Sequence, residues 1–94
     1  MFILSLTYTA PLSEVDEHIE PHMAWVAKGY EAGLFLASGR KEPRTGGAIL
    51  ARGDRAALEA LSATDPFVVA GVAQYDIVEL VLSRTAPGLE QLKV

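Results

Sequence analysis

Apolar residues alternate with polar ones at the start of the chain. Over residues 2–8 the positions Phe2, Leu4 and Leu6 fall on one side of an extended segment, and this period of two is typical of a half-buried β-strand. The same alternation, or a short apolar run bounded by turn residues, predicts three further strands at 34–38, 47–52 and 74–82. A polar, glycine-bounded loop over 39–46 is expected between the second and third strands.

The first helical stretch lies between the first two predicted strands. Ser13 with Asp16 three residues later is typical of a helix N-terminus, and Gly33 is suited to end the helix. Pro21 interrupts the pattern because proline lacks the N–H that bonds four residues back. We therefore expect a short leading turn, then a principal helix over 21–32.

The second helical stretch lies between the third and fourth strands. Asp54 is expected to cap a helix over 55–61, and Asp65-Pro66 to begin a short helix over 67–72. The order β-α-β-β-α-β predicts an α+β, ferredoxin-like fold, in which two helical segments cover one face of a four-stranded antiparallel sheet.

The length and hydropathy of the chain bear on its assembly. Ninety-four residues are expected to form one domain, with a core over about 1–83 and an irregular tail over 84–94. A chain this short buries a modest fraction of its surface, yet its mean hydropathy is +0.23. We therefore expect the open face of the sheet to pair with a second copy, as a homodimer or a higher homo-oligomer.

Composition excludes several classes of function. The chain has no cysteine, so disulfides, thiolate zinc sites and cysteine nucleophiles are ruled out. Its net charge is −4 with acidic and basic residues interspersed, which argues against nucleic acid as a partner. The apolar start is too short for a secretory leader and no stretch reaches the length of a membrane span. We therefore expect no membrane partner and a cytoplasmic location.

His22 is the residue that most invites a chemical role. Histidine titrates near neutral pH, and a carboxylate on its far nitrogen would fix its tautomer and raise its basicity. Asp65 is the candidate carboxylate if the second helical stretch brings it beside the first. Aspartate before proline is also a preferred helix cap, so capping alone would account for Asp65.

Four further residues could contact a substrate, and each has a structural alternative. Ser38 and Gly39 could present a hydroxyl and an N–H to a substrate oxygen, or could form a strand-end turn. Trp25 and Phe67 could wall an aromatic pocket, or could pack in the core or an interface.

Charged loop residues and a second histidine have similar alternatives. Arg44, with Arg40 and Lys41, could guide an anionic substrate, or could be solvated loop charges. His18 and His22 have the four-residue spacing of metal ligands on a helix. Pro21 interrupts that helix and no third ligand is evident, so we expect no metal, and no cofactor.

Three motifs in order resemble the YciI-like (YCII-related) family. They are His22 with Trp25 three residues on, Ser38-Gly39 after the second strand, and Asp65-Pro66-Phe67 at the start of a short helix. The likeness extends over about residues 1–83. It implies a subunit of the dimeric α+β-barrel superfamily, with an active site built on His22 and Asp65 and with Pro66 and Phe67 beside the substrate.

The resemblance also implies a kind of chemistry. The better-understood branch of the family acts on chlorinated hydroxy-aromatic rings, and its structural relatives include muconolactone isomerases. It thus implies a lyase- or isomerase-type enzyme that uses a His–Asp pair to move protons on a small ring compound. Family members often carry arginine before the proline–histidine step, where this chain has Glu20, which weakens the case for an anionic substrate. The alternative is a non-catalytic dimer that binds a small metabolite or supports a partner protein.

Overall fold

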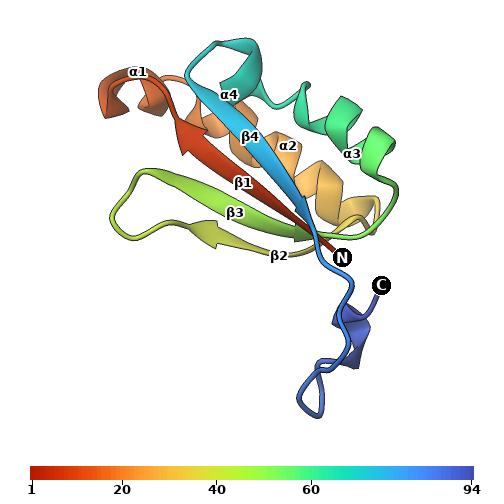
Figure 1. Cartoon of the computed structure of the whole chain (residues 1–94). Coiled ribbons are helices and arrows are strands. Elements are labelled where there is room, and N and C mark those ends of the chain that lie inside the picture. Colours follow the sequence, from red (N-terminus) through yellow and green to blue (C-terminus); the bar gives the residue numbers. More distant parts are fainter.

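The four predicted strands form one antiparallel sheet in the computed structural model, which describes all residues 1–94 (Figure 1). The elements follow in the order β1 (Phe2–Tyr8), α1 (Leu12–Asp16), α2 (Ile19–Glu31), β2 (Phe35–Arg40), β3 (Gly46–Ala51), α3 (Arg55–Ser62), α4 (Pro66–Val69), β4 (Ala73–Glu79) and the 3₁₀ turn η1 (Glu90–Leu92). The strand order β2-β3-β1-β4 and the chain path confirm the predicted ferredoxin-like α+β fold.

The core lies between the sheet and the helices, which cover one face of it (Figure 1). Alternate residues of β1 (Phe2, Leu4 and Leu6) are at most 4% exposed, as their period of two predicted. Two apolar clusters extend from this strand. The larger lies under α2 and α3, and the smaller lies under α1 and α4.

Gly29 lets α2 approach the sheet closely. A Cβ built at this position would lie 2.1 Å from the ring of Phe35, so any side chain would collide with it. The Phe35 ring also contacts Trp25, at 5.4 Å between ring centroids. The absence of a side chain at one position of α2 thus sets how the helix packs on β2.

The first helical stretch is interrupted earlier than the sequence predicted. The break comes at Glu17–His18, between α1 and α2, and Pro21 is the third residue of α2. A proline in the first helical turn removes only an N–H that has no partner within the helix, so it does not break the helix there. Ser13 is not a cap either, because α1 begins at Leu12 with Pro11 before it and no side-chain cap.

The ends of several other elements also differ from the prediction. α4 ends at Val69 rather than at residue 72, and β2 reaches Arg40 rather than residue 38. β4 ends at Glu79 rather than at residue 82, opposite the first residue of β1: Phe2 pairs with Glu79. Leu80 still exchanges two backbone hydrogen bonds with Met1, and beyond it the chain continues as a tail (Figure 1), in which Val81 is 91% exposed.

No helix in the structure combines the length and the apolar character that crossing a membrane would require. The longest, α2, has 13 residues.

Candidate active site

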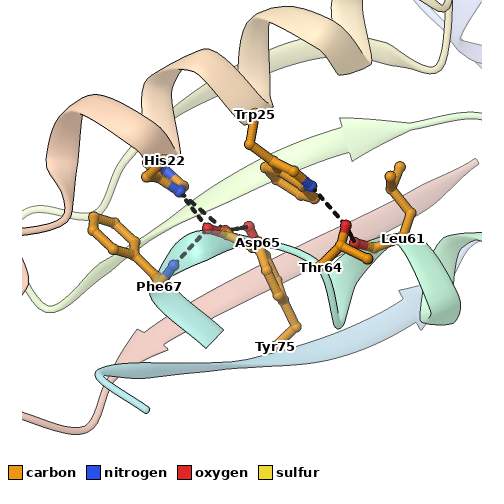
Figure 2. A network of polar contacts seen from close by, with 7 residues as sticks. All are labelled: His22, Trp25, Leu61, Thr64, Asp65, Phe67 and Tyr75. Atoms are coloured by element: carbon orange, nitrogen blue, oxygen red, sulfur yellow. Dashed lines mark hydrogen bonds and ion pairs between the residues drawn. The ribbon is translucent and has the colours of Figure 1, made fainter. Parts of the chain in front are cut away.

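His22 and Asp65 lie in direct contact, as Figure 2 shows. His22 is in the first turns of α2, and its Nδ1 lies 2.8 Å from Oδ1 and 3.0 Å from Oδ2 of Asp65. The Asp65 side chain is completely buried, whereas that of His22 is 14% exposed. The two residues are 43 positions apart in sequence, and the packing of α4 beside α2 brings them together.

Asp65 caps α4 and also holds two side chains. Its Oδ1 accepts the N–H of Phe67 at 2.9 Å, which is the capping bond, while Pro66 at the start of the helix has no N–H to satisfy. Its Oδ2 accepts the hydroxyl of Tyr75 at 2.6 Å. The two roles that the sequence left open for Asp65 therefore coexist, because two carboxylate oxygens serve three donors.

This contact sets the tautomer of the neutral histidine. An ionised carboxylate only accepts hydrogen bonds, so a neutral His22 that bonds it through Nδ1 carries its hydrogen on that nitrogen. The other ring nitrogen, Nε2, makes no hydrogen bond within the chain and keeps a lone pair. The ring borders a cavity, so the arrangement can take up or release a proton there.

Aromatic rings fix the orientation of the imidazole. The ring of Phe67 stacks on that of His22 with 4.0 Å between centroids and 9° between planes. The ring of Trp25 also stacks on that of His22 but at a larger separation, with 6.2 Å between centroids and 24° between planes. Because the histidine ring is held by stacking and by two close oxygens, it has little freedom to turn away from Asp65.

Trp25 connects α2 to the segment before Asp65 through hydrogen bonds. Its indole Nε1–H donates to Oγ1 of Thr64 at 2.9 Å, and that hydroxyl donates to the carbonyl of Leu61 at 2.6 Å (Figure 2). This chain of bonds ties α2 to the connection between α3 and α4, next to Asp65. The indole is buried in the core. Of the two alternatives for Trp25, core packing is the one observed.

The cavity beside His22 has a volume of about 600 Å³, which is within the range of small-molecule sites. Its wall comes from α2, α4 and all four strands, and it is mostly apolar with a few polar groups. The lining residues are Leu6, Tyr8, Ile19, His22, Met23, Val26, Ser38, Gly39, Arg40, Arg44, Gly46, Gly47, Ala48, Ile49, Phe67 and Tyr75.

The predicted substrate residues divide into two groups. Ser38, Gly39, Arg44 and Phe67 line the cavity together with His22, whereas Trp25 and Pro66 do not. The hydroxyl oxygen of Ser38 is 2.7 Å from that of Tyr30, so the end of β2 is tied to α2. Predicted residues from the helices (His22 and Phe67) and from β2 and the loop after it (Ser38, Gly39 and Arg44) therefore border the same cavity.

Arg44 is held at the edge of the cavity. Its Nη2 donates to Oδ1 of Asp16 at 2.5 Å, and its guanidinium lies 5.8 Å from the centroid of the Tyr8 ring. The hydrogen bond to Asp16 raises the pKa of Arg44 above its ordinary value. Arg44 thus has defined partners that were not predicted, and in the same loop Lys41 donates from Nζ to Oγ1 of Thr7 at 3.3 Å.

Sequence reasoning missed Tyr75. Burial, and next the hydrogen bond to Asp65, raise the pKa of Tyr75 far above its ordinary value, so its hydroxyl stays a donor throughout the neutral range. The available signal was its place in the alternating strand: Tyr75 falls on the inward side of β4 with Ala73 and Ile77. A hydroxyl at an inward position needs a partner, but the partner comes from a distant segment.

The metal-ligand spacing of His18 and His22 is not joined by a third ligand. No three side chains of the types His, Asp and Glu gather as ligands. His18 immediately precedes α2 as its N-cap and does not border the cavity that His22 lines.

Comparisons with known proteins agree with the fold. A family model described as the YCII-related domain matches residues 1–81. A search of curated proteins found no match. A solved structure of 5-chloro-2-hydroxyhydroquinone dehydrochlorinase (TftG) from Burkholderia phenoliruptrix, in complex with 2,5-dihydroxybenzoquinone, is similar with a TM-score of 0.63 and 16% identity over 85% of this chain and 93% of that one. At this identity the likeness shows a shared fold.

Proposed function

The chain belongs to the YCII-related family, and we propose that it is a small-molecule enzyme of the lyase or isomerase type. In this proposal His22 and Asp65 move a proton on a small cyclic or hydroxy-aromatic compound. The observation that carries the proposal is the contact between Nδ1 of His22 and the fully buried carboxylate of Asp65, beside an open cavity.

The proposed reaction starts from the neutral tautomer of His22, in which Nε2 keeps a lone pair. Nε2 of His22 takes a proton from a hydroxyl or C–H group of the ring compound, and Asp65 stabilises the imidazolium that forms. In an isomerisation the imidazolium returns the proton to another atom of the ring. In an elimination the electron pair left on the ring expels an anion such as chloride, and the imidazolium later releases its proton to water.

The cavity suits a small ring compound. Phe67 and the apolar side chains of β1 and β3 offer apolar surfaces, while Ser38 and Arg44 offer polar groups. A hydroxylated ring needs both kinds of contact. The similar structure from Burkholderia phenoliruptrix holds 2,5-dihydroxybenzoquinone, a compound of this kind, and this supports the proposed substrate class.

The test is turnover of a panel of chlorinated hydroxyhydroquinones and ring lactones, followed by mass spectrometry of products and by chloride release. We expect His22→Gln to lower turnover by at least about 100-fold, the usual contribution of general acid–base catalysis. His18→Gln is the matched control, because it removes a histidine of the same stretch that does not border the cavity. Equal turnover by the His22→Gln variant and the unaltered protein would refute the assignment.

A second candidate is a non-catalytic protein that binds a small metabolite. It is favoured by the titratable groups in the cavity: apart from His22, these are Tyr8, Arg40, Arg44 and Tyr75, and the Tyr75 hydroxyl is engaged by Asp65. No carboxylic acid borders the cavity as a second proton carrier. This candidate predicts thermal stabilisation by a ligand that is recovered unchanged, and a converted product would count against it.

We further propose that the protein acts as a homodimer or a higher homo-oligomer paired through the sheet face that the helices leave open. Ala37, Leu50, Ile3 and Val78 form a continuous apolar row across the four strands on that face, as the strand registers show. The cytoplasmic location stays a prediction.

A further inference from the structure

We propose that Tyr75 is a positioning residue for the His22–Asp65 pair. Its hydroxyl anchors the carboxylate of Asp65 and shares the charge that would otherwise act on His22 alone, and in this way it sets how strongly Nε2 binds a proton. The assignment rests on the proposed acid–base role of His22, but its test below requires no substrate.

The geometry places Tyr75 and His22 in competition for one acceptor group. The Tyr75 hydroxyl lies 2.6 Å from Oδ2 of Asp65, at the short end for a hydrogen bond to a carboxylate, and Nδ1 of His22 lies 3.0 Å from the same oxygen. The remaining oxygen, Oδ1, is divided between Nδ1 and the N–H of Phe67. Each donor therefore weakens the others, because together they stabilise one negative charge.

The tyrosine ring is well placed to keep this bond. Tyr75 pairs with Leu6 in the β1–β4 ladder, so its backbone is fixed within the sheet. Its ring packs against that of Trp25, with 6.1 Å between centroids. It borders both the cavity of His22 and a second cavity of about 310 Å³ next to α3. The hydroxyl thus reaches Asp65 from the strand, opposite the helix that carries His22 (Figure 2).

Loss of the hydroxyl has a predictable electrostatic consequence. Without the Tyr75 donor, the carboxylate keeps more of its charge for His22, and the positively charged imidazolium gains more than the neutral ring does. The protonated form of His22 is then favoured. Tyr75→Phe should therefore make His22 hold its proton to higher pH.

The other charged or titratable groups around His22 are the same in the Tyr75→Phe variant and in the unaltered protein. They are Tyr8 on β1, Arg40 at the end of β2, and Arg44 on the β2–β3 loop with its partner Asp16, the last residue of α1. None of them has a hydrogen bond to His22 or Asp65, so their influence cancels when variant and unaltered protein are compared.

The experiment is an NMR titration of the His22 ring in the full chain, assigned by comparison with His22→Gln. In Tyr75→Phe we expect the midpoint of the titration to rise by about half a pH unit. Tyr30→Phe is the matched control, because it removes a tyrosine hydroxyl that contacts Ser38 and leaves Asp65 untouched; its midpoint should equal that of the unaltered protein. An unchanged or lower midpoint in Tyr75→Phe would overturn the proposal.

A second variant keeps the test decisive if Tyr75→Phe does not fold. A tyrosine that carries fluorine next to its hydroxyl, incorporated at position 75, retains the bond and is a stronger donor because the phenol is more acidic. The midpoint of the His22 titration should then move to lower pH, and the absence of any shift would refute the role of Tyr75. If the midpoints move as expected but no substrate is converted, the proposed enzyme function fails while the positioning role of Tyr75 stands.

Discussion

Asp54 and Asp65 each cap a helix, but their carboxylates differ in burial and in the other groups that they bind. The side chain of Asp54 accepts one backbone N–H, that of Ala57, at the protein surface. Asp65 accepts a backbone N–H, a histidine and a tyrosine in a fully buried setting. The same kind of residue at the same kind of position thus has a local role in one case and joins three segments in the other.

This difference predicts unequal losses of stability. Asp54→Ala should lower the free energy of unfolding by about 1 kcal/mol, the usual value for a helix cap. Asp65→Ala should lower it by about 3 kcal/mol or more, because the Tyr75 hydroxyl and Nδ1 of His22 lose their buried acceptor. Urea denaturation of both variants measures the difference. Equal losses would mean that Asp65 acts as a cap alone.

How far the site could be predicted depends on where each signal lies. His22 and Asp65 were predicted because each has a local reason to be noticed: a titratable ring early in a helix, and an acid before proline. Tyr75 and Asp16 were not, because their partners, Asp65 and Arg44, come from other elements. Trp25 was predicted near the site, but its indole N–H is used to hold Thr64.

At the scale of elements, residue patterns predicted the order of strands and helices but not all of their ends. The inward period of β1 is a property of its own sequence, so it was predictable. β4 ends opposite the first residue of β1, and the break at Glu17–His18 is marked by no proline or glycine. Such boundaries depend on partners that local patterns do not contain.

Gly29 gives a prediction at this scale. In Gly29→Ala the new methyl group would meet the Phe35 ring at 2.1 Å, so α2 or the ring must move. We expect a loss of about 2 kcal/mol in the free energy of unfolding, despite the higher helix propensity of alanine. Gly39→Ala is the matched control, because no atom lies within 4 Å of its added Cβ; its stability should change by less than about 0.5 kcal/mol. Thermal or urea denaturation compares them, and equal stabilities would contradict the packing argument.

At the scale of the whole molecule, the two faces of the sheet differ. Helices cover one face (Figure 1). By the strand registers, the apolar row of Ala37, Leu50, Ile3 and Val78 crosses the other. Val78 is 43% exposed, although a valine side chain is more stable when it is buried away from water. Pairing of two such faces would bury the row, which is the physical basis for expecting a dimer.

A lysine at Val78 tests this pairing. Light scattering of the unaltered protein at micromolar concentration should give at least twice the mass of one chain. Val78→Lys should give a monomer, because two copies would bring unpaired charges into the contact. Val69→Lys places the same charge at a residue that is 74% exposed on α4, on the helical side, and should not change the mass. A monomeric unaltered protein would exclude the paired sheets. The cavity and the His22–Asp65 contact would remain, since every residue in them belongs to one chain.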